Sequence, residues 1–356
     1  MRAIANFVVV LRYAFSLVLS SMVVFMVATY FLALVLGMAL IFFAPGGVAV
    51  SQGFLDKAPL VLFMLFPFNL RLGTSLGVLF TFLLLIYLMC LLAAWLGPVK
   101  SFPSAVRDGF HDPVGQLFGN CLYSTPLIAS MLFLAAFAIQ SLQDGLGIPT
   151  GHISFSDPFK GLIDLAYASV AEEIGYRISP IGVLLLAYVF WIGRTRVAEM
   201  PWHDRVKLVF LAFLFPSGAK DLLGLKTVSK SGIRNGVSTP EWAMLVVTSL
   251  QFGLAHFLSG TGWKLGKIAS ASFLGFGMGL SYLIYGAHAP VLIHLFFNYY
   301  LTAYNIAAET YPIGLQYVNQ AIDVVIFALG TIGWLISILL CAGKELLRAM
   351  RNRYLA

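Results

Sequence analysis

The chain has 356 residues, of which 60% are hydrophobic and only 10% are charged, and its mean hydropathy is +0.90. Soluble domains are about 45–50% apolar and roughly 25% charged, so this composition excludes a soluble fold, and the many aromatic residues exclude a disordered chain. The net charge of +7 fits the Lys and Arg excess of cytoplasmic loops and predicts no nucleic-acid partner. The sequence indicates an all-α, polytopic transmembrane helical bundle in a lipid bilayer, which we expect to be the cell membrane.

Long apolar stretches follow one another along the chain and predict one integral membrane domain over residues 1–356. The expected spans are residues 13–43, 73–96, 114–139, 161–191, 242–257, 268–285, 289–307 and 318–340. A shorter apolar stretch, 58–70, contains Pro67 and lies between Lys57 and Arg71, a pattern that favours an interfacial segment.

The stretch 161–191 is apolar at both ends but carries charged residues in its middle. If it crosses once, the chain has about eight spans, both termini are cytoplasmic, and most of the 22 Lys and Arg residues lie inside. If it crosses twice, this bias reverses, so the positive-inside rule favours a single crossing. Its roughly 32 residues would reach about 48 Å as a helix, so the span must protrude, tilt or bend at Pro180.

The first group of polar residues within a span is Glu172-Glu173-Ile174-Gly175-Tyr176-Arg177. On a helix, Glu173 and Arg177 are four residues apart and can form an ion pair, whereas Glu172 points about 100° away. A structural interpretation is one internal salt bridge with a stray carboxylate. A buried, unpaired carboxylate is costly, however, and such a group is a plausible general base.

Two further groups lie on later spans. Phe252 and His256 are one helical turn apart, and so are His294 and Asn298. Each pair therefore projects from one helix face. His256 alone is more simply explained as a satisfied polar residue. His294 and Asn298 could be interhelical hydrogen-bond donors or two donors to one substrate oxygen.

Other polar and small residues in the spans have simpler interpretations. Asp164 is expected to be an interfacial carboxylate, and Gly275 and Gly279 form a G-x-x-x-G pattern typical of close helix packing. The three cysteines are far apart and have no metal-ligand spacing.

Taken together, E-E-x-x-x-R, F-x-x-x-H and H-x-x-x-N occur in this order on three separate predicted spans. This set resembles the CPBP family of intramembrane proteases, which comprises the type II CAAX prenyl proteases and the Abi bacteriocin-processing proteins. The stretch Ala289–His294 also looks like the family, and the resemblance covers residues 161–300, the catalytic half.

The resemblance implies an intramembrane endopeptidase that hydrolyses a membrane-associated protein or peptide substrate without a metal cofactor. Glu172 and His256 would activate a water for attack on a peptide carbonyl. His294 and Asn298 would stabilise the resulting oxyanion, and Glu173, Arg177 and Phe252 would have supporting roles. Oligomeric state and substrate are not indicated by the sequence.

Two alternatives remain open at the level of sequence. One is a zinc metalloprotease of similar shape, in which His256, His294 and a glutamate hold the metal, although no H-E-x-x-H motif is present. The other is a non-enzymatic immunity or transport protein that uses the polar cluster as a proton relay or binding site. No inverted repeat supports a transporter.

Overall fold

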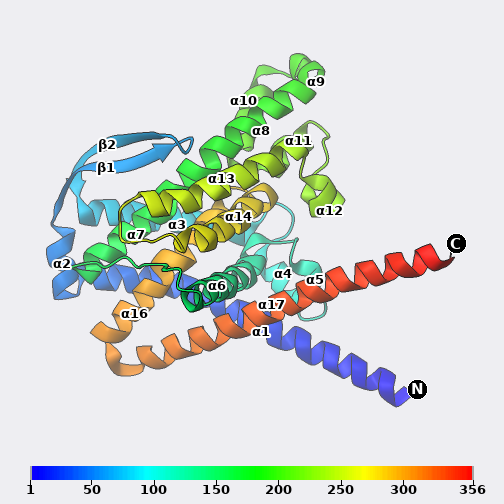
Figure 1. Cartoon of the computed structure of the whole chain (residues 1–356), viewed down its shortest axis with the longest axis horizontal. Coiled ribbons are helices and arrows are strands. Elements are labelled where there is room, and N and C mark those ends of the chain that lie inside the picture. The colour runs from blue at the N-terminus through cyan, green and yellow to red at the C-terminus, as the bar shows by residue number, and fades with distance from the viewer. Residues whose placement is uncertain (1, 355–356) are drawn as a thin grey trace.

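The computed structural model describes the backbone of residues 2–354 and the side chains of residues 9–312 and 314–342. Nearly all of this chain is helical (Figure 1). Within the described residues, seven helical stretches are long and apolar enough to cross a membrane: Val9–Phe42, Leu76–Leu96, Cys121–Gly145, Pro158–Ile192, Thr239–Leu258, Lys267–Tyr285 and Gly314–Ala342. The predicted polytopic helical bundle is therefore confirmed.

Six of these stretches are single helices, and shorter helices connect them. The six are α1 (Arg2–Phe42), α3 (Leu76–Leu96), α6 (Cys121–Gly145), α13 (Thr239–Leu258), α14 (Lys267–Tyr285) and α17 (Pro312–Tyr354). The connecting helices are α2 (Pro45–Ser51), α4 (Phe102–Gly109), α5 (Pro113–Gln116), α9 (Arg194–Glu199), α10 (Trp202–Leu214), α11 (Pro216–Leu222) and α12 (Val228–Gly236). The polar connection before α13 is therefore itself helical.

The charged fourth stretch is one continuous helical path, as predicted. It consists of α7 (Pro158–Glu173), the π-helical turn η1 (Ile174–Ile178) and α8 (Ser179–Ile192). In the wider turn, the N–H of Ser179 donates to the carbonyl of Ile174, five residues earlier. Pro180 follows directly and lacks an N–H group, so the irregular turn lies just before the proline that the sequence marked as a bend.

The seventh expected span, 289–307, is helical but differs from the others. It consists of α15 (His288–Leu295), the π-helical turn η2 (Phe296–Tyr300) and α16 (Leu301–Thr310), and it is not among the seven apolar stretches. Residues 288–296 are all buried. This central helix is surrounded by protein, so it tolerates Tyr and Asn side chains whose polar groups find protein partners.

Tyrosines of the central helix attach it to α1. Tyr299 donates to the Ala33 carbonyl at 2.9 Å and Tyr304 to the Thr29 carbonyl at 3.0 Å, while the hydroxyls of Tyr300 and Thr29 are 2.7 Å apart. These bonds satisfy buried hydroxyls and fix the rotation of the helix that carries His294 and Asn298.

Residues 58–70 are not helical and are not among the stretches long enough to span a membrane, and their interfacial position stays a prediction. They belong to an antiparallel hairpin of β1 (Phe54–Leu62) and β2 (Phe66–Ser75), the only sheet in the described chain. The hairpin lies beside α7, and β2 is exposed along most of its length (Figure 1). Its turn contacts η1, because the N–H of Met64 donates to the Gly175 carbonyl at 3.1 Å.

Two glycines bring α14 close to its neighbours, as the G-x-x-x-G pattern predicted. A Cβ at Gly279 would lie 2.4 Å from the Leu245 side chain on α13, and one at Gly275 would lie 3.0 Å from the Arg177 guanidinium. Only a residue without a side chain permits these approaches. The α13–α14 pair therefore forms one wall against the charged motif of the fourth span.

Candidate active site

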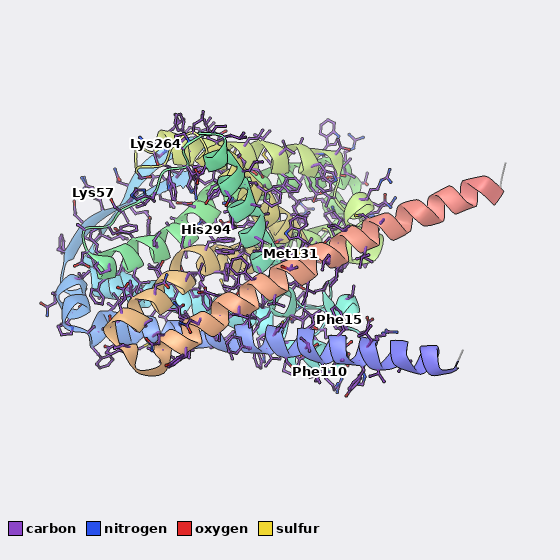
Figure 2. All side chains as sticks on the ribbon, turned by 60° about the horizontal axis from the view of Figure 1, so that its bottom comes forward. Phe15, Lys57, Phe110, Met131, Lys264 and His294 are labelled. Atoms are coloured by element: carbon purple, nitrogen blue, oxygen red, sulfur yellow. The ribbon has the colours of Figure 1, made fainter. Side chains whose placement is uncertain are left out.

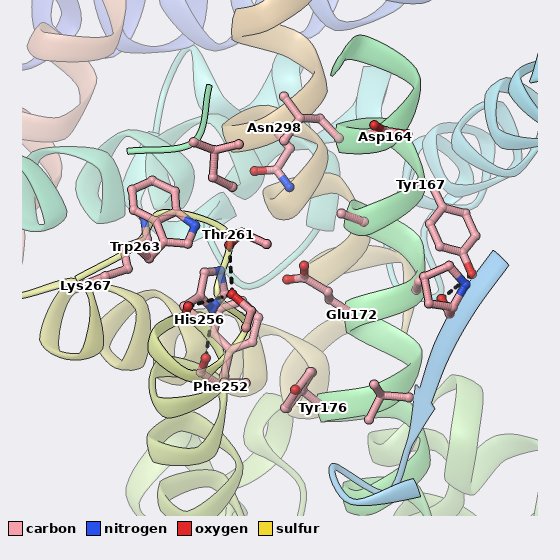
Figure 3. Close-up of a pocket in the computed structure, with 18 of the residues that line it drawn as sticks. Asp164, Tyr167, Glu172, Tyr176, Phe252, His256, Thr261, Trp263, Lys267 and Asn298 are labelled. Carbon is pink, nitrogen blue, oxygen red and sulfur yellow. Dashed lines mark hydrogen bonds between the residues drawn. The ribbon is translucent and has the colours of Figure 1, made fainter. Parts of the chain in front are cut away.

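The three sequence motifs meet at one cavity of about 600 Å³. Its lining includes Glu172 from α7, His256 from α13 and Asn298 from η2. Figure 3 shows Glu172 and His256 on opposite walls, with the Asn298 side chain directed toward the space between them. Helices that are far apart in sequence therefore place the predicted residues around a common space.

Glu173 and Arg177 form the predicted ion pair and are completely buried. Arg177 Nη1 donates to Glu173 Oε1 at 2.8 Å, and both side chains are 0% exposed. Two charges removed from water are tolerated only when they are closely paired. This pair therefore fixes the first motif rather than facing the cavity.

Arg177 also joins the first motif to the second. Its guanidinium lies 3.9 Å from the centroid of the Phe252 ring, a cation–π arrangement. The Phe252 ring in turn contacts the His256 ring, with centroids 4.6 Å apart. The position of His256 thus depends on packing that begins at the buried ion pair.

His294 is held by the same carboxylate as Arg177. Its Nδ1 lies 2.7 Å from Glu173 Oε1, and its Nε2 lies 3.7 Å from Glu172 Oε2 and 3.1 Å from Asn298 Nδ2. His294 is 4% exposed and lies inside the bundle, whereas Lys57 and Lys264 lie at its periphery (Figure 2). The sequence did not predict the bond between Glu173 and His294.

The surroundings of the His294 ring indicate which of its nitrogens donates a hydrogen bond and which accepts one. Because Nδ1 faces a carboxylate, it donates, and a neutral His294 then accepts at Nε2 from the Asn298 amide. One Asn298 N–H remains available to another acceptor. His294 becomes a second donor toward the cavity only as the doubly protonated imidazolium, so the predicted pair of donors depends on its charge.

His256 has a defined tautomer as well. Its Nδ1 lies 2.8 Å from the Phe252 carbonyl, one turn earlier on α13, and a carbonyl can only accept. In the neutral ring Nε2 therefore carries a lone pair. His256 lines the cavity, so this nitrogen is able to accept a proton there.

Glu172 differs from its neighbour in making only a longer contact, with its Oε2 3.7 Å from His294 Nε2. Its side chain is 32% exposed, and its buried Oε2 atom makes no hydrogen bond. Glu172 lies on the cavity wall rather than in the ion pair. A carboxylate with free acceptor capacity in a cavity can bind and deprotonate a water molecule.

Several lining residues have no counterpart in the sequence prediction. Lys267 and Trp263 belong to the start of α14 and the preceding loop, and the Lys267 ammonium lies 3.8 Å from the Trp263 ring centroid. Pro59 and Val61 of β1 line another part. The four-residue spacing of Trp263 and Lys267 was the sequence signal that could have indicated this part of the cavity lining.

The two histidines reach the site from different positions on their helices. His256 lies two residues before the end of α13, and His294 lies just before η2 on the buried central helix. Asp164 pairs with Lys160 at 2.6 Å and also lines the larger cavity, and its interfacial position stays a prediction.

The zinc alternative requires three convergent ligands. In the part of the chain that the structure describes, no group of three His, Cys, Asp or Glu side chains is placed to hold a metal ion. Nδ1 of His294 and Nδ1 of His256 are both engaged by protein acceptors. The absence of a metal cofactor stays a prediction.

No protein-family model, curated protein or solved structure matches the chain.

Proposed function

We propose that this multi-pass membrane protein is an intramembrane endopeptidase of the glutamic type, a member of the CPBP family acting in the cell membrane. The observation that supports this proposal most strongly is the arrangement of Glu172, His256 and Asn298, from three helices, around one cavity of about 600 Å³. Each motif alone is weak evidence for a site, but polar side chains of all three motifs around one cavity in an apolar bundle are stronger evidence.

In this proposal the cavity holds a water molecule and a peptide carbonyl. Glu172 accepts one proton from the water while the water oxygen attacks the carbonyl carbon. His256, with a lone pair on Nε2, takes part in the proton transfers. The proton then passes to the leaving amine as the C–N bond breaks, which gives a carboxylic acid and an amine.

Asn298 is the donor that the geometry supports for the oxyanion. One of its N–H groups bonds to His294, and the other is directed at the cavity. The Glu173 carboxylate at 2.7 Å from Nδ1 fixes the His294 ring, and His294 Nε2 in turn orients the Asn298 amide at 3.1 Å. Glu173 therefore has a larger supporting role than the sequence assigned to it.

The Glu172→Gln variant tests the function directly. Membranes that contain wild-type or Glu172→Gln protein at equal abundance should be compared by proteomics for new peptide termini. The amide keeps the size of the side chain but cannot take up a proton, so we expect termini that are present only with the wild type. Glu309→Gln, on an exposed position of α16, is the matched control.

Other outcomes would favour the alternatives. A non-enzymatic protein would give identical termini with both chains. A metalloprotease would lose its activity to a chelator, and added zinc alone would restore it.

A further inference from the structure

A second cavity of about 310 Å³ adjoins the first. Phe252, His256, Lys267 and Asn298 line both of them, so these residues form the shared boundary. Glu172 lines only the larger cavity, whereas His152 and His294 line only the smaller one. A group held between Glu172 and Asn298 would therefore lie directly beside the opening of the second cavity, which we call the side chamber.

One helix forms the apolar wall of the side chamber. Ala271, Leu274 and Met278 of α14 recur at intervals of three and four residues, which places them on one helix face. Phe297 of η2 adds an aromatic side chain. The volume is at the lower limit of ligand sites, which span about 300–1,000 Å³, so it suits a single side chain rather than a peptide segment.

We propose that the side chamber binds one bulky apolar side chain of the substrate, that of a residue next to the hydrolysed bond. This inference rests on the proposed endopeptidase function. A peptide whose carbonyl lies at the shared boundary has its neighbouring residue within reach of the chamber. Ala271, Leu274 and Met278 are thus the residues that determine which side chain is accepted.

The charge of Lys267 at the shared boundary further restricts which substrate side chains the side chamber accepts. Lys267 lines the chamber, and its ammonium lies against the Trp263 ring without a carboxylate partner among the described residues. A Lys or Arg side chain of the substrate would meet this like charge and no carboxylate in the chamber lining, and would be rejected. A Leu, Met or Phe side chain has no such conflict.

The test is a cleavage-preference profile of the full chain in detergent micelles. The probe is a library of peptides from digested membrane proteins, and mass spectrometry identifies the residues on both sides of each new terminus. We expect wild type to select Leu, Met or Phe at one of the two positions. One methylene in an apolar pocket changes selectivity by about 10- to 200-fold, so single substitutions should alter the profile measurably.

Two variants change the chamber in opposite directions. Met278→Ala enlarges it and should shift the preference toward Phe and Trp. Ala271→Leu fills it and should shift the preference toward Gly and Ala, with at least about a tenfold loss for Phe. Ala269→Leu, an exposed position on the same helix, is the matched control and should keep the wild-type profile.

The possible results distinguish a failure of the side-chamber assignment from a failure of the proposed endopeptidase function. Ala271 is 1% exposed, so if Ala271→Leu does not fold, Leu274→Ala gives a second enlarged chamber. Active variants with the wild-type profile at both positions would overturn the side-chamber assignment and leave the protease intact. A preference for Asp or Glu that disappears in Lys267→Met would assign the chamber to a carboxylate instead. No cleavage by wild type would refute both proposals.

Discussion

Glu172 and Glu173 are adjacent in sequence but have entirely different surroundings. Glu173 is 0% exposed and bonds to Arg177 and His294, whereas Glu172 is 32% exposed on the cavity wall. The 100° rotation between successive helical residues separates them. One carboxylate therefore holds the site together, and the other is available for chemistry.

Replacement of Arg177 by Ala should destabilise the protein. It leaves Glu173 buried with an uncompensated charge and removes the contact with Phe252, and breaking a buried pair costs about 3–5 kcal/mol. We expect a large decrease in the thermal stability of the solubilised protein. The double variant Arg177→Ala/Glu173→Ala should recover part of it. A fully stable Arg177→Ala protein without turnover would instead indicate direct catalysis by Arg177.

Asn298→Ala should slow the reaction without abolishing it. Loss of one oxyanion donor typically costs about 10²–10³ in turnover, and His294 also loses its partner at Nε2. Substrate affinity should be largely kept, so kcat decreases more than KM changes. Wild-type turnover in this variant would contradict the oxyanion role, while a full loss together with stoichiometric zinc in the wild type would favour the metalloprotease.

At the scale of elements, an irregular helical turn lies within each of two motifs. The π-helical turn η1 begins directly after Glu173, and η2 contains Asn298. Such turns redirect side chains and recur at functional sites. The hairpin is attached to the first of them, because the N–H groups of Phe63 and Met64 donate to Ser179 and Gly175.

Gly175→Ala should detach the hairpin from η1. A Cβ at this position would lie 2.6 Å from the Val61 carbonyl oxygen, so one backbone must move, at a cost of about 1–3 kcal/mol. Hydrogen exchange should increase at residues 59–64 in particular. Gly145→Ala, whose Cβ would meet no atom within 4 Å, is the control. Unchanged exchange in Gly175→Ala would contradict this docking.

The local pairs could be predicted from sequence, but the distant contacts could not. Spacing alone indicated Glu173 with Arg177 and His294 with Asn298, because four residues make one helical turn. The bond between Glu173 and His294 joins two helices and has no such signal. The hairpin was missed because its turn uses Phe63 and Met64 at positive φ, where Gly, Asn or Asp is expected.

At the scale of the whole molecule, the fold agrees with the expected polytopic helical bundle. Seven stretches among the described residues are long and apolar enough to cross a membrane, one fewer than the eight expected spans, and the remaining expected span forms the buried central helix. The direction in which the bundle is inserted is a separate prediction from the distribution of Lys and Arg.

Thiol labelling of intact cells tests this orientation. In a variant with Cys90, Cys121 and Cys341 replaced by Ala, new cysteines at the exposed positions Lys226 and Lys264 should behave differently. A membrane-impermeant reagent should label Lys264→Cys and should not label Lys226→Cys until the cells are permeabilised. The reverse pattern would place both termini outside.

The free edge of the hairpin has a consequence for the surrounding bilayer. Pro59 and Pro67 lack N–H groups, so the ladder bonds use the alternate residues, and Asn69 and Arg71 of β2 direct their backbone groups outward. The hairpin turn contacts Gly175, at the middle of the span Pro158–Ile192. Hydrocarbon does not tolerate such an edge. We therefore expect lipid to withdraw from this flank, so that water reaches the neighbourhood of a site that, in the proposed function, consumes one water molecule per bond.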